Sequence, residues 1–229
     1  FPGDDDDVFG GRAQDPEAVG RCHQLILGIV EEYIEGDEYS CESISIDGYH
    51  QVLAYTKKFT TGDPNYIEIG HMQPAQFDDC MEIKIERTIK KALDALEIKN
   101  GASHTEFKID SKGEVYIIEI GARMAGDCIG SDLVELSTGI DYVKLVIEVA
   151  CGKKPQINGL SKTSNAVVRF VLSPKDLEVI EKLEEKYEVV RKSVFNVDFA
   201  SDVTDSSTRH GYIIITSDNA ASLLSTENW

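Results

Sequence analysis

The segment between His104 and Ile120 constrains the fold most strongly. It reads as two strands, 104–110 and 115–120, in which apolar and polar residues alternate on either side of a short polar loop. This pattern is typical of a half-buried antiparallel hairpin. With a four-residue loop at 111–114, Glu106 lies directly opposite Glu119 on one face of the hairpin.

Two carboxylates on neighbouring strands, with Cβ atoms about 5 Å apart, repel each other. In a cleft, such a pair would protonate one member or recruit a cation, and hard oxygen ligands suit Mg²⁺. The alternative is that both side chains face solvent or pair with lysines such as Lys108. Because isoleucines flank Glu119, we expect it in a buried strand, which favours the cleft.

The residues that follow this hairpin suggest an anion site. Arg123 comes four residues after Glu119 and supplies a cation. Gly126 and Gly130 then precede a helical segment that extends to Ala150. Backbone N–H groups at a glycine-rich turn before a helix commonly bind phosphate or an oxyanion.

The remaining pattern predicts an α+β protein, because its strands occur in hairpins rather than in βαβ units. Asp47-Gly48 joins two strands, and apolar residues at three- and four-residue steps predict a long amphipathic helix. The predicted elements are a helix at 16–28, strands at 29–34, 38–46 and 49–59, a loop at 60–77, a helix at 78–99, a strand at 165–172, a helix opened by Ser173-Pro174, and strands at 187–198 and 212–216.

We therefore predict three parts of the chain. Residues 1–28 form an acidic loop and a helix, residues 29–155 form the unit that holds the carboxylate pair, and residues 156–229 form a small α+β domain; the resemblance described below implies that the second part is the catalytic subdomain and the first the remnant of a preceding one. The chain does not begin with methionine, so we expect it to be the back portion of a longer protein.

Composition narrows the function classes. Of the 229 residues, 41% are hydrophobic, enough for one large core or two small ones. The formal charge of −18 would repel phosphate backbones and anionic lipids, so we expect neither nucleic-acid nor membrane binding. Five cysteines without a CxxC pair argue against a disulfide framework or a zinc site. Reducing cytoplasm is the expected location.

Four stretches, in order, resemble the ATP-grasp superfamily, in particular its carboxylate–amine ligases, which include L-amino-acid ligases and carbamoyl-phosphate-synthase-like proteins. They are Glu31–Glu38, the Gly-His-Met-Gln-Pro sequence at 70–74, Glu106 with Glu119, and the Glu-Ile-Gly-Ala-Arg sequence at 119–123. The resemblance covers residues 29–155 in detail and implies an ATP-grasp fold, an antiparallel sheet with helices. Each motif is weak alone, whereas four in order are specific.

By this resemblance, Glu31, Glu32, Tyr33 and Ile34 would meet the adenine, and Glu38 would take the ribose hydroxyls. The alternative for these glutamates is that they are solvent-exposed charges at the edge of an acidic protein, with no role in binding. Lys58 is a candidate phosphate contact, with Lys57 an equal alternative.

The resemblance also implies which residues surround the phosphates of the nucleotide. Glu106 and Glu119 would hold Mg²⁺, with Mn²⁺ as an alternative, against the phosphates of ATP. Arg123 would stabilise charge on the transferring phosphoryl group, and His71 would line the acceptor pocket. Gly121 stands where many relatives carry a metal-binding Asn, so a second ion is not required. The N-terminal domain and the glycine-rich flap of the family are not visible in the sequence.

The implied activity is an ATP-dependent ligation of a carboxylate to an amine through an acyl phosphate, forming an amide or peptide bond. Two readings compete with it. One is a carbamoyl-phosphate-synthase-like or purine-pathway ligase, and the other is a non-catalytic structural or nucleotide-binding module. Substrates would be small carboxylates and amines. Such ligases are often dimers, so a homodimer is open, and the sequence does not name either substrate.

Overall fold

The computed structural model describes residues 31–63, 65–157, 163–194, 199 and 203–219. Its contacts divide the chain into two compact units, residues 1–33 and residues 34–229. Only Glu31, Glu32 and Tyr33 of the first unit are described, and residues 31–35 have no regular secondary structure. The predicted strand at 29–34 is therefore wrong over residues 31–34, and the predicted helix at 16–28 lies outside the described residues.

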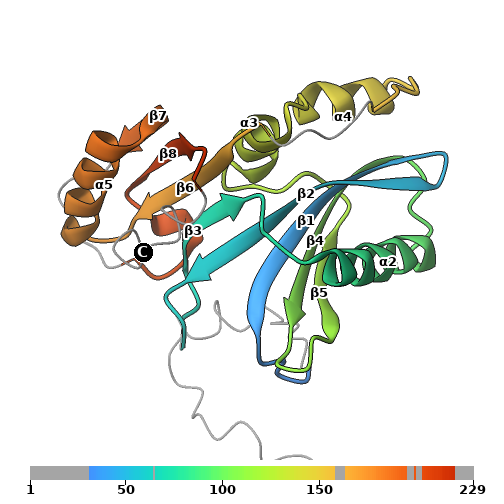
Figure 1. Ribbon diagram of the computed structural model, residues 1–229, viewed down its shortest axis with the longest axis horizontal. Helices are drawn as coiled ribbons and strands as arrows, with labels where there is room; N and C mark the ends of the chain where they lie inside the picture. Colours follow the sequence, from blue (N-terminus) through green and yellow to red (C-terminus); the bar gives the residue numbers. More distant parts are fainter. Residues whose placement is uncertain (1–30, 64, 158–162, 195–198, 200–202, 220–229) are drawn as a thin grey trace, which may run out of the picture. The chain divides into compact units, whose positions relative to one another are not determined.

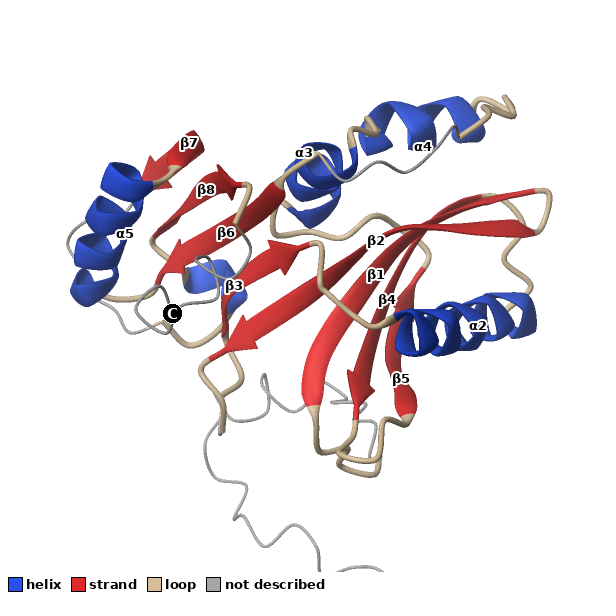
Figure 2. Ribbon diagram, in the orientation of Figure 1, coloured by secondary structure: helices blue, strands red, loops and turns tan. Residues whose placement is uncertain are grey.

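Residues 34–229 are organised around one eight-stranded sheet in which every neighbouring pair of strands is antiparallel (Figure 2). The order across the sheet is β5-β4-β1-β2-β3-β6-β8-β7. The strands are β1 (Asp37–Ile46), β2 (Tyr49–Thr60), β3 (Glu68–Gln73), β4 (Gly101–Ile109), β5 (Val115–Gly121), β6 (Asn165–Val171), β7 (Glu188–Val194) and β8 (Gly211–Ser217). The predicted α+β class is confirmed.

The turn between β1 and β2 follows directly from its sequence. Asp47 and Gly48 both have positive φ angles, 52° and 81°, which are the left-handed values that a two-residue hairpin needs. An aspartate tolerates this region and a glycine enters it without steric cost. The predicted hairpin is confirmed.

The long predicted helix is present as α2 (Asp79–Ala95), and its start and its buried face follow from the sequence. The side chain of Asp78 accepts a hydrogen bond from the backbone N–H of Met81, which caps the first turn. Ile85, Ile89 and Leu93 are buried at four-residue steps against Phe107 and other residues of the sheet. The helix thus covers part of one face of the sheet.

Helices cover both faces of the sheet (Figure 1). Residues that pair directly across strands share a face, so α2 and α5 (Pro174–Lys186) lie on one face, where Met72 pairs with Val167. The π-helical turn η1 (Ile129–Leu133), α3 (Val134–Thr138) and α4 (Tyr142–Ala150) lie on the other face. The predicted helical run to Ala150 is thus present, and it is interrupted at Gly139, whose φ is 75°.

Strand β3 corrects the predicted loop at 60–77. It lies in the middle of the sheet, between β2 and β6, and His71 within it is fully buried. The glycine and proline around it mask a six-residue strand that has partners on both sides. Because β3 pairs with β6, the sheet continues across the predicted boundary at residue 156, and the division into domains stays a prediction.

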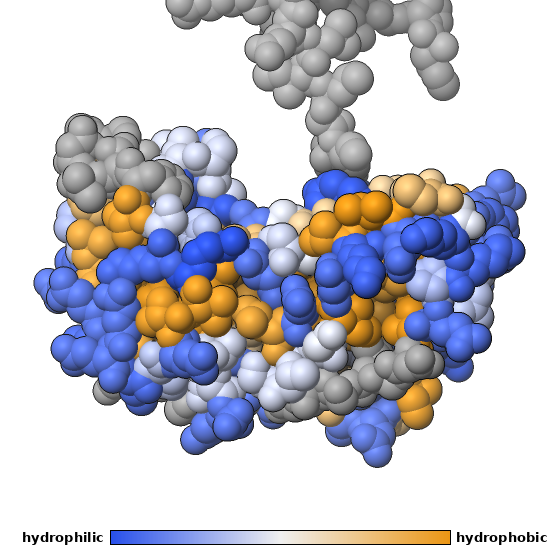
Figure 3. Space-filling model, turned by 90° about the horizontal axis from the view of Figure 1, so that it is seen from above, coloured by the Kyte–Doolittle hydropathy of each residue, from blue (hydrophilic) through white to orange (hydrophobic). Residues whose placement is uncertain are grey.

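The C-terminal elements follow their predicted order, with the part of the strand expected at 195–198 outside the described residues. Ser173 caps α5 through a capping box with Asp176, and Pro174 stands at its start. Hydrophobic and hydrophilic surface alternate on the side shown in Figure 3. No helix in the described part of the chain combines the length and the apolar content that a membrane crossing requires.

Candidate functional site

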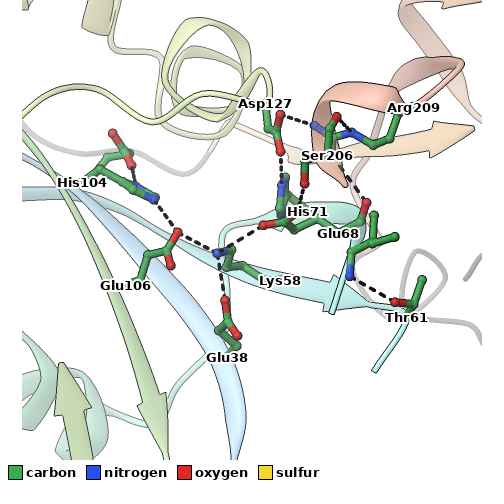
Figure 4. A network of polar contacts seen from close by, with 12 residues as sticks. Glu38, Lys58, Thr61, Glu68, His71, His104, Glu106, Asp127, Ser206 and Arg209 are labelled. Carbon is green, nitrogen blue, oxygen red and sulfur yellow. Dashed lines mark hydrogen bonds and ion pairs between the residues drawn. The ribbon is translucent and has the colours of Figure 1, made fainter. Parts of the chain in front are cut away.

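A network of charged side chains lies on the face of the sheet opposite α2, and Lys58 of β2 is at its centre (Figure 4). The Nζ atom of Lys58 lies 2.8 Å from Glu38, 2.7 Å from Glu106 and 3.9 Å from Glu68. Strands β1, β2, β3 and β4 each supply one of these four residues. A single buried ammonium therefore links four strands.

The alternative assignment to Lys57 does not match this geometry, because successive side chains of a strand point to opposite faces. Lys57 pairs with Asp37 at 3.1 Å and lies near the rings of Tyr39 and Phe59, on the α2 side of the sheet. Of the two lysines, only Lys58 faces the charged network.

The network sets the protonation of its members. Burial alone would raise the pKa of Glu106, but its bonds to His104 and Lys58 outweigh burial and lower the pKa to about 2. Burial would likewise lower the pKa of Lys58, and here Glu106 and Glu38 raise it instead. At neutral pH, Glu106 is an anion held between two cations.

A second chain of contacts runs from Glu42 through His104 to Glu106. The Nδ1 atom of His104 lies 2.5 Å from Glu42 Oε1, and its Nε2 atom lies 3.2 Å from Glu106 Oε1. Burial would lower the pKa of His104, but the two carboxylates raise it to about 9. Neither Glu42 nor His104 is marked as a site residue by its local sequence, because the two meet only through a cross-strand contact between residues 62 apart.

The predicted pairing of Glu106 with Glu119 is present, although the register around it differs from the expected one. Near the turn, Phe107 pairs with Ile117 rather than with Ile118, and an irregularity between Glu106 and Phe107 restores the expected register. The two carboxylates thus share one face of the hairpin.

The environment predicted for Glu119 is wrong. Strand β5 is the edge of the sheet, and Glu119 is exposed there, as are Tyr116 and Ile118, each at 37%. Glu106 is the buried member of the pair, and its cations are Lys58 and His104. The isoleucine-rich sequence signals burial of a strand but does not distinguish a central strand from an edge strand.

Residues of the segment from Gly121 to Gly130 line, together with the charged network, a cavity of about 310 Å³. The cavity is lined by residues of the network, of this segment and of the C-terminal part of the chain: Lys58, Glu68, His71, His104, Glu106, Arg123, Ala125, Gly126, Asp127, Ile129 and Ser206. Arg123 is exposed and donates a hydrogen bond to the backbone oxygen of Met124 at 2.9 Å. The predicted residues Lys58, His71, Glu106 and Arg123 therefore meet at one cavity, which Glu119 does not line.

His71 lies in β3 and not in the predicted loop. Its Nε2 atom is 3.4 Å from Asp127 Oδ2, and its Nδ1 atom has no hydrogen-bonding partner among the described residues. Burial lowers the pKa of His71 despite the neighbouring carboxylate. At neutral pH the ring is therefore neutral and donates from Nε2, since a neutral imidazole carries one N–H.

The C-terminal part of the chain contributes two side chains. Ser206 donates to Glu68, and Arg209 pairs with Asp127. Nothing in the local sequence around Arg209 indicates a contact with a segment 82 residues earlier.

The predicted nucleotide residues fall into two groups. Glu31, Glu32 and Tyr33 belong to the first unit, so their adenine role stays a prediction. Ile34 accepts a hydrogen bond on its backbone oxygen from Lys108 at 3.3 Å, and Glu38 is bound to Lys58. Their roles toward adenine and ribose also stay predictions.

Comparison with known proteins shows which proteins this chain is similar to. Residues 22–131 match the model of the ATP-grasp domain. Alanine–anticapsin ligase of Bacillus subtilis is 31% identical over 142 residues, which cover 56% of this chain and 29% of that protein. The corresponding ligase of Bacillus amyloliquefaciens is 30% identical over the same length. The chain thus spans less than a third of the length of these curated relatives.

Solved structures extend the similarity to most of the chain. The L-amino acid ligase from Bacillus licheniformis superimposes with a TM-score of 0.71 and 26% identity over 83% of this chain and 51% of that one. Phosphoribosylglycinamide synthetase from Anaerococcus prevotii gives 0.69 at 21% identity over 83% of this chain and 50% of that one, which shows a shared fold. Residues 22–131 are therefore similar to the ATP-grasp domain, and the chain has the fold of the L-amino acid ligase.

Proposed function

We propose that this chain carries the phosphate-binding part of an ATP-dependent carboxylate–amine ligase. The observation that carries the proposal is that Glu106, which faces Glu119 across β4 and β5, lines a cavity together with Lys58 and Arg123. Phosphoryl transfer requires cations around the triphosphate and a rigid frame, and this face of the sheet supplies both.

The proposed reaction has two steps. A substrate carboxylate oxygen attacks the γ-phosphorus of ATP, the bond from that phosphorus to the bridging oxygen breaks, and ADP leaves. An amine then attacks the acyl carbon, inorganic phosphate leaves, and the nitrogen loses a proton. Lys58 and Arg123 would neutralise phosphate charge, and no side chain of the cavity needs to act as a covalent nucleophile.

The donor set fits a divalent cation. Lys58 and His104 both contact Oε1 of Glu106, which leaves Oε2 without a partner among the described residues, and Glu119 faces it across the hairpin. Within the described ranges no three His, Cys, Asp or Glu side chains are grouped to hold a metal. Two carboxylates with water and phosphate oxygens completing the shell suit Mg²⁺, which when bound supplies charge neutralisation of the triphosphate. Mn²⁺ is the alternative ion.

The amide-forming reaction is favoured over the purine-pathway alternative by the comparisons. The curated relatives at 30–31% identity are alanine–anticapsin ligases, and a solved structure at 26% identity is an L-amino acid ligase. We therefore propose small carboxylate and amine substrates, with His71 lining the acceptor side of the cavity. We propose that the enzyme acts in the cytoplasm and forms a homodimer, which sedimentation analysis of the natural full-length protein would test.

Titration calorimetry of the natural full-length protein with Mg·ATP tests the nucleotide site. We expect binding that Glu119→Gln weakens at least about tenfold, since one charged ligand is lost. Glu114→Gln is the matched control, because Glu114 adjoins the same strand but pairs with Lys84 of α2 at 2.8 Å. If the wild type shows no heat of Mg·ATP binding, or if both variants lose the same affinity for Mg·ATP, the result would favour a non-catalytic module.

Phosphate release with pools of amino acids and other carboxylates tests the reaction. We expect release that requires both a carboxylate and an amine, and an amide product that mass spectrometry detects. Release that requires bicarbonate in place of a carboxylic acid would point instead to a carbamoyl-phosphate-synthase-like activity.

A further inference from the structure

The segment over the cavity contains two consecutive residues in an unfavourable backbone conformation. Asp127 and Cys128 have φ angles of 53° and 64°, and neither is glycine. Single non-glycine residues in this left-handed region cost conformational energy and persist only where surrounding contacts hold them. The contacts of Asp127 therefore decide whether the segment keeps this shape.

Two of the contacts that hold this segment come from the sheet. The backbone N–H of Ala125 donates to Oε2 of Glu42 at 3.0 Å, and Nε2 of His71 lies 3.4 Å from Oδ2 of Asp127. Glu42 and His71 are both fully buried, on β1 and β3. The segment is thus fixed at two points to rigid strands.

The third contact comes from the C-terminal part of the chain. Arg209 pairs through its guanidinium with Oδ1 of Asp127, the oxygen that His71 does not use (Figure 4). The same guanidinium lies 3.6 Å from the ring centroid of Phe170, and its Nε donates to the backbone oxygen of Ser206 at 2.6 Å. A planar, multiply bonded guanidinium of this kind is pre-organised to fix one carboxylate orientation.

Arg209 does not itself line the cavity, whereas Arg123, Gly126 and Asp127 do. We propose that Arg209 is a positioning residue of the site: it fixes Asp127, and through Asp127 it holds the segment that presents Arg123 and Gly126 to the cavity. This inference rests on the proposed ligase function for its kinetic consequence only. It makes the C-terminal part of the chain a component of the phosphate-binding site.

A neighbouring ion pair supplies a matched control. Arg191 of β7 pairs with Asp132 of η1 at 2.6 Å and has one weak contact with the segment itself, 3.8 Å to Sγ of Cys128, so it also joins the C-terminal part of the chain to the region after Gly121. Its side chain is 46% exposed, and neither partner lines the cavity. If Arg209 only helped to attach the C-terminal part of the chain, replacing either arginine would change hydrogen exchange of the cavity segment to a similar extent.

Hydrogen exchange of the natural full-length protein without nucleotide tests the positioning role directly. We expect Arg209→Ala to speed exchange in a peptide covering residues 122–130 at least about tenfold, with the Ala125 amide most affected. Arg191→Ala removes only the weak contact with Cys128 and should change exchange in that peptide far less than Arg209→Ala does. Arg209→Lys keeps the positive charge but lacks the planar guanidinium with its several N–H donors, so it should give an intermediate exchange rate. Equal rates in the wild type and Arg209→Ala, or equal acceleration in both alanine variants, would overturn the proposal.

Kinetics give a second measurement. A misplaced cavity segment should lower kcat of ATP-dependent phosphate release by about tenfold to a hundredfold, with KM for ATP changed less than about threefold. Guanidinium ion added in solution should restore part of kcat in Arg209→Ala and nothing in Arg191→Ala. Asp127→Asn keeps the side-chain size, should show the same exchange change, and serves if Arg209→Ala does not fold. If the wild type has no ligase activity, the proposed function fails while the exchange result still decides the positioning role.

Discussion

Replacing Glu106 by glutamine should destabilise the protein, whereas replacing its partner Glu119 should not. The contacts of Glu106 with Lys58 and His104 lower its pKa from the ordinary 4.5 to about 2. One pKa unit corresponds to about 1.4 kcal/mol, so ionised Glu106 contributes about 3 kcal/mol to the free energy of unfolding at neutral pH. Glu119 is exposed, and exposed charges of this kind contribute about 0.5 kcal/mol or less.

The pH dependence follows from the sign of this shift. Because the folded protein holds Glu106 below its unfolded pKa, the stabilisation is complete above about pH 5 and is lost as the pH falls towards 2. The difference in unfolding free energy between wild type and Glu106→Gln should therefore shrink by roughly 1 kcal/mol between pH 7 and pH 4.

Urea denaturation with EDTA and without nucleotide measures both variants in the absence of any metal contribution. We expect Glu106→Gln to lose about 3 kcal/mol at pH 7 and Glu119→Gln to stay within about 0.5 kcal/mol of the wild type. Mg·ATP binding should be weakened in both. A Glu106→Gln protein as stable as the wild type at pH 7, or a stability loss that grows on acidification, would refute the assigned contacts.

Three further changes test the framework, each by urea denaturation of the same protein. Ile89→Ala creates a cavity at a fully buried position on the sheet-facing side of α2. It should lower the free energy of unfolding by about 2–5 kcal/mol, and a loss below about 1 kcal/mol would contradict the packing. Gly211→Ala would place a Cβ atom 2.4 Å from the backbone oxygen of Ser193, so it should destabilise the pairing of β7 with β8, and hydrogen exchange in β7 should rise. Tyr142→Phe removes a buried hydrogen bond of 2.8 Å to the backbone oxygen of Ser43 and should cost about 1 kcal/mol, with no loss if that bond is absent.

Local patterns predicted the parts of the fold that local chemistry determines. The Asp47-Gly48 turn and the apolar face of α2 are set by neighbouring residues, so their prediction needed no tertiary information. Strand β3 (Glu68–Gln73) was missed because Gly70 within it and Pro74 after it are typical of loops, and because its central place depends on strand partners on both sides.

The residues of the site also fall into those that the sequence indicates and those that only the fold brings together. The facing of Glu106 and Glu119 follows from the hairpin, and the motifs pointed to Lys58, His71 and Arg123. The partners of these residues could not be predicted, because Glu42, His104, Asp127 and Arg209 are ordinary charged residues in sequence and meet only across the folded chain. The exposure of Glu119 depends on strand order, which no local pattern specifies.

The contacts around the cavity also determine when it can form. They join residues 48 apart between Lys58 and Glu106, 83 apart between Glu42 and Ala125, and 138 apart between Glu68 and Ser206. During synthesis, the ribosome must therefore have released the chain past Ser206 before the last of these pairs can form. Contacts of such long range form slowly, so the chain should acquire ligand-binding competence only late in folding, after its helices and first hairpin are in place.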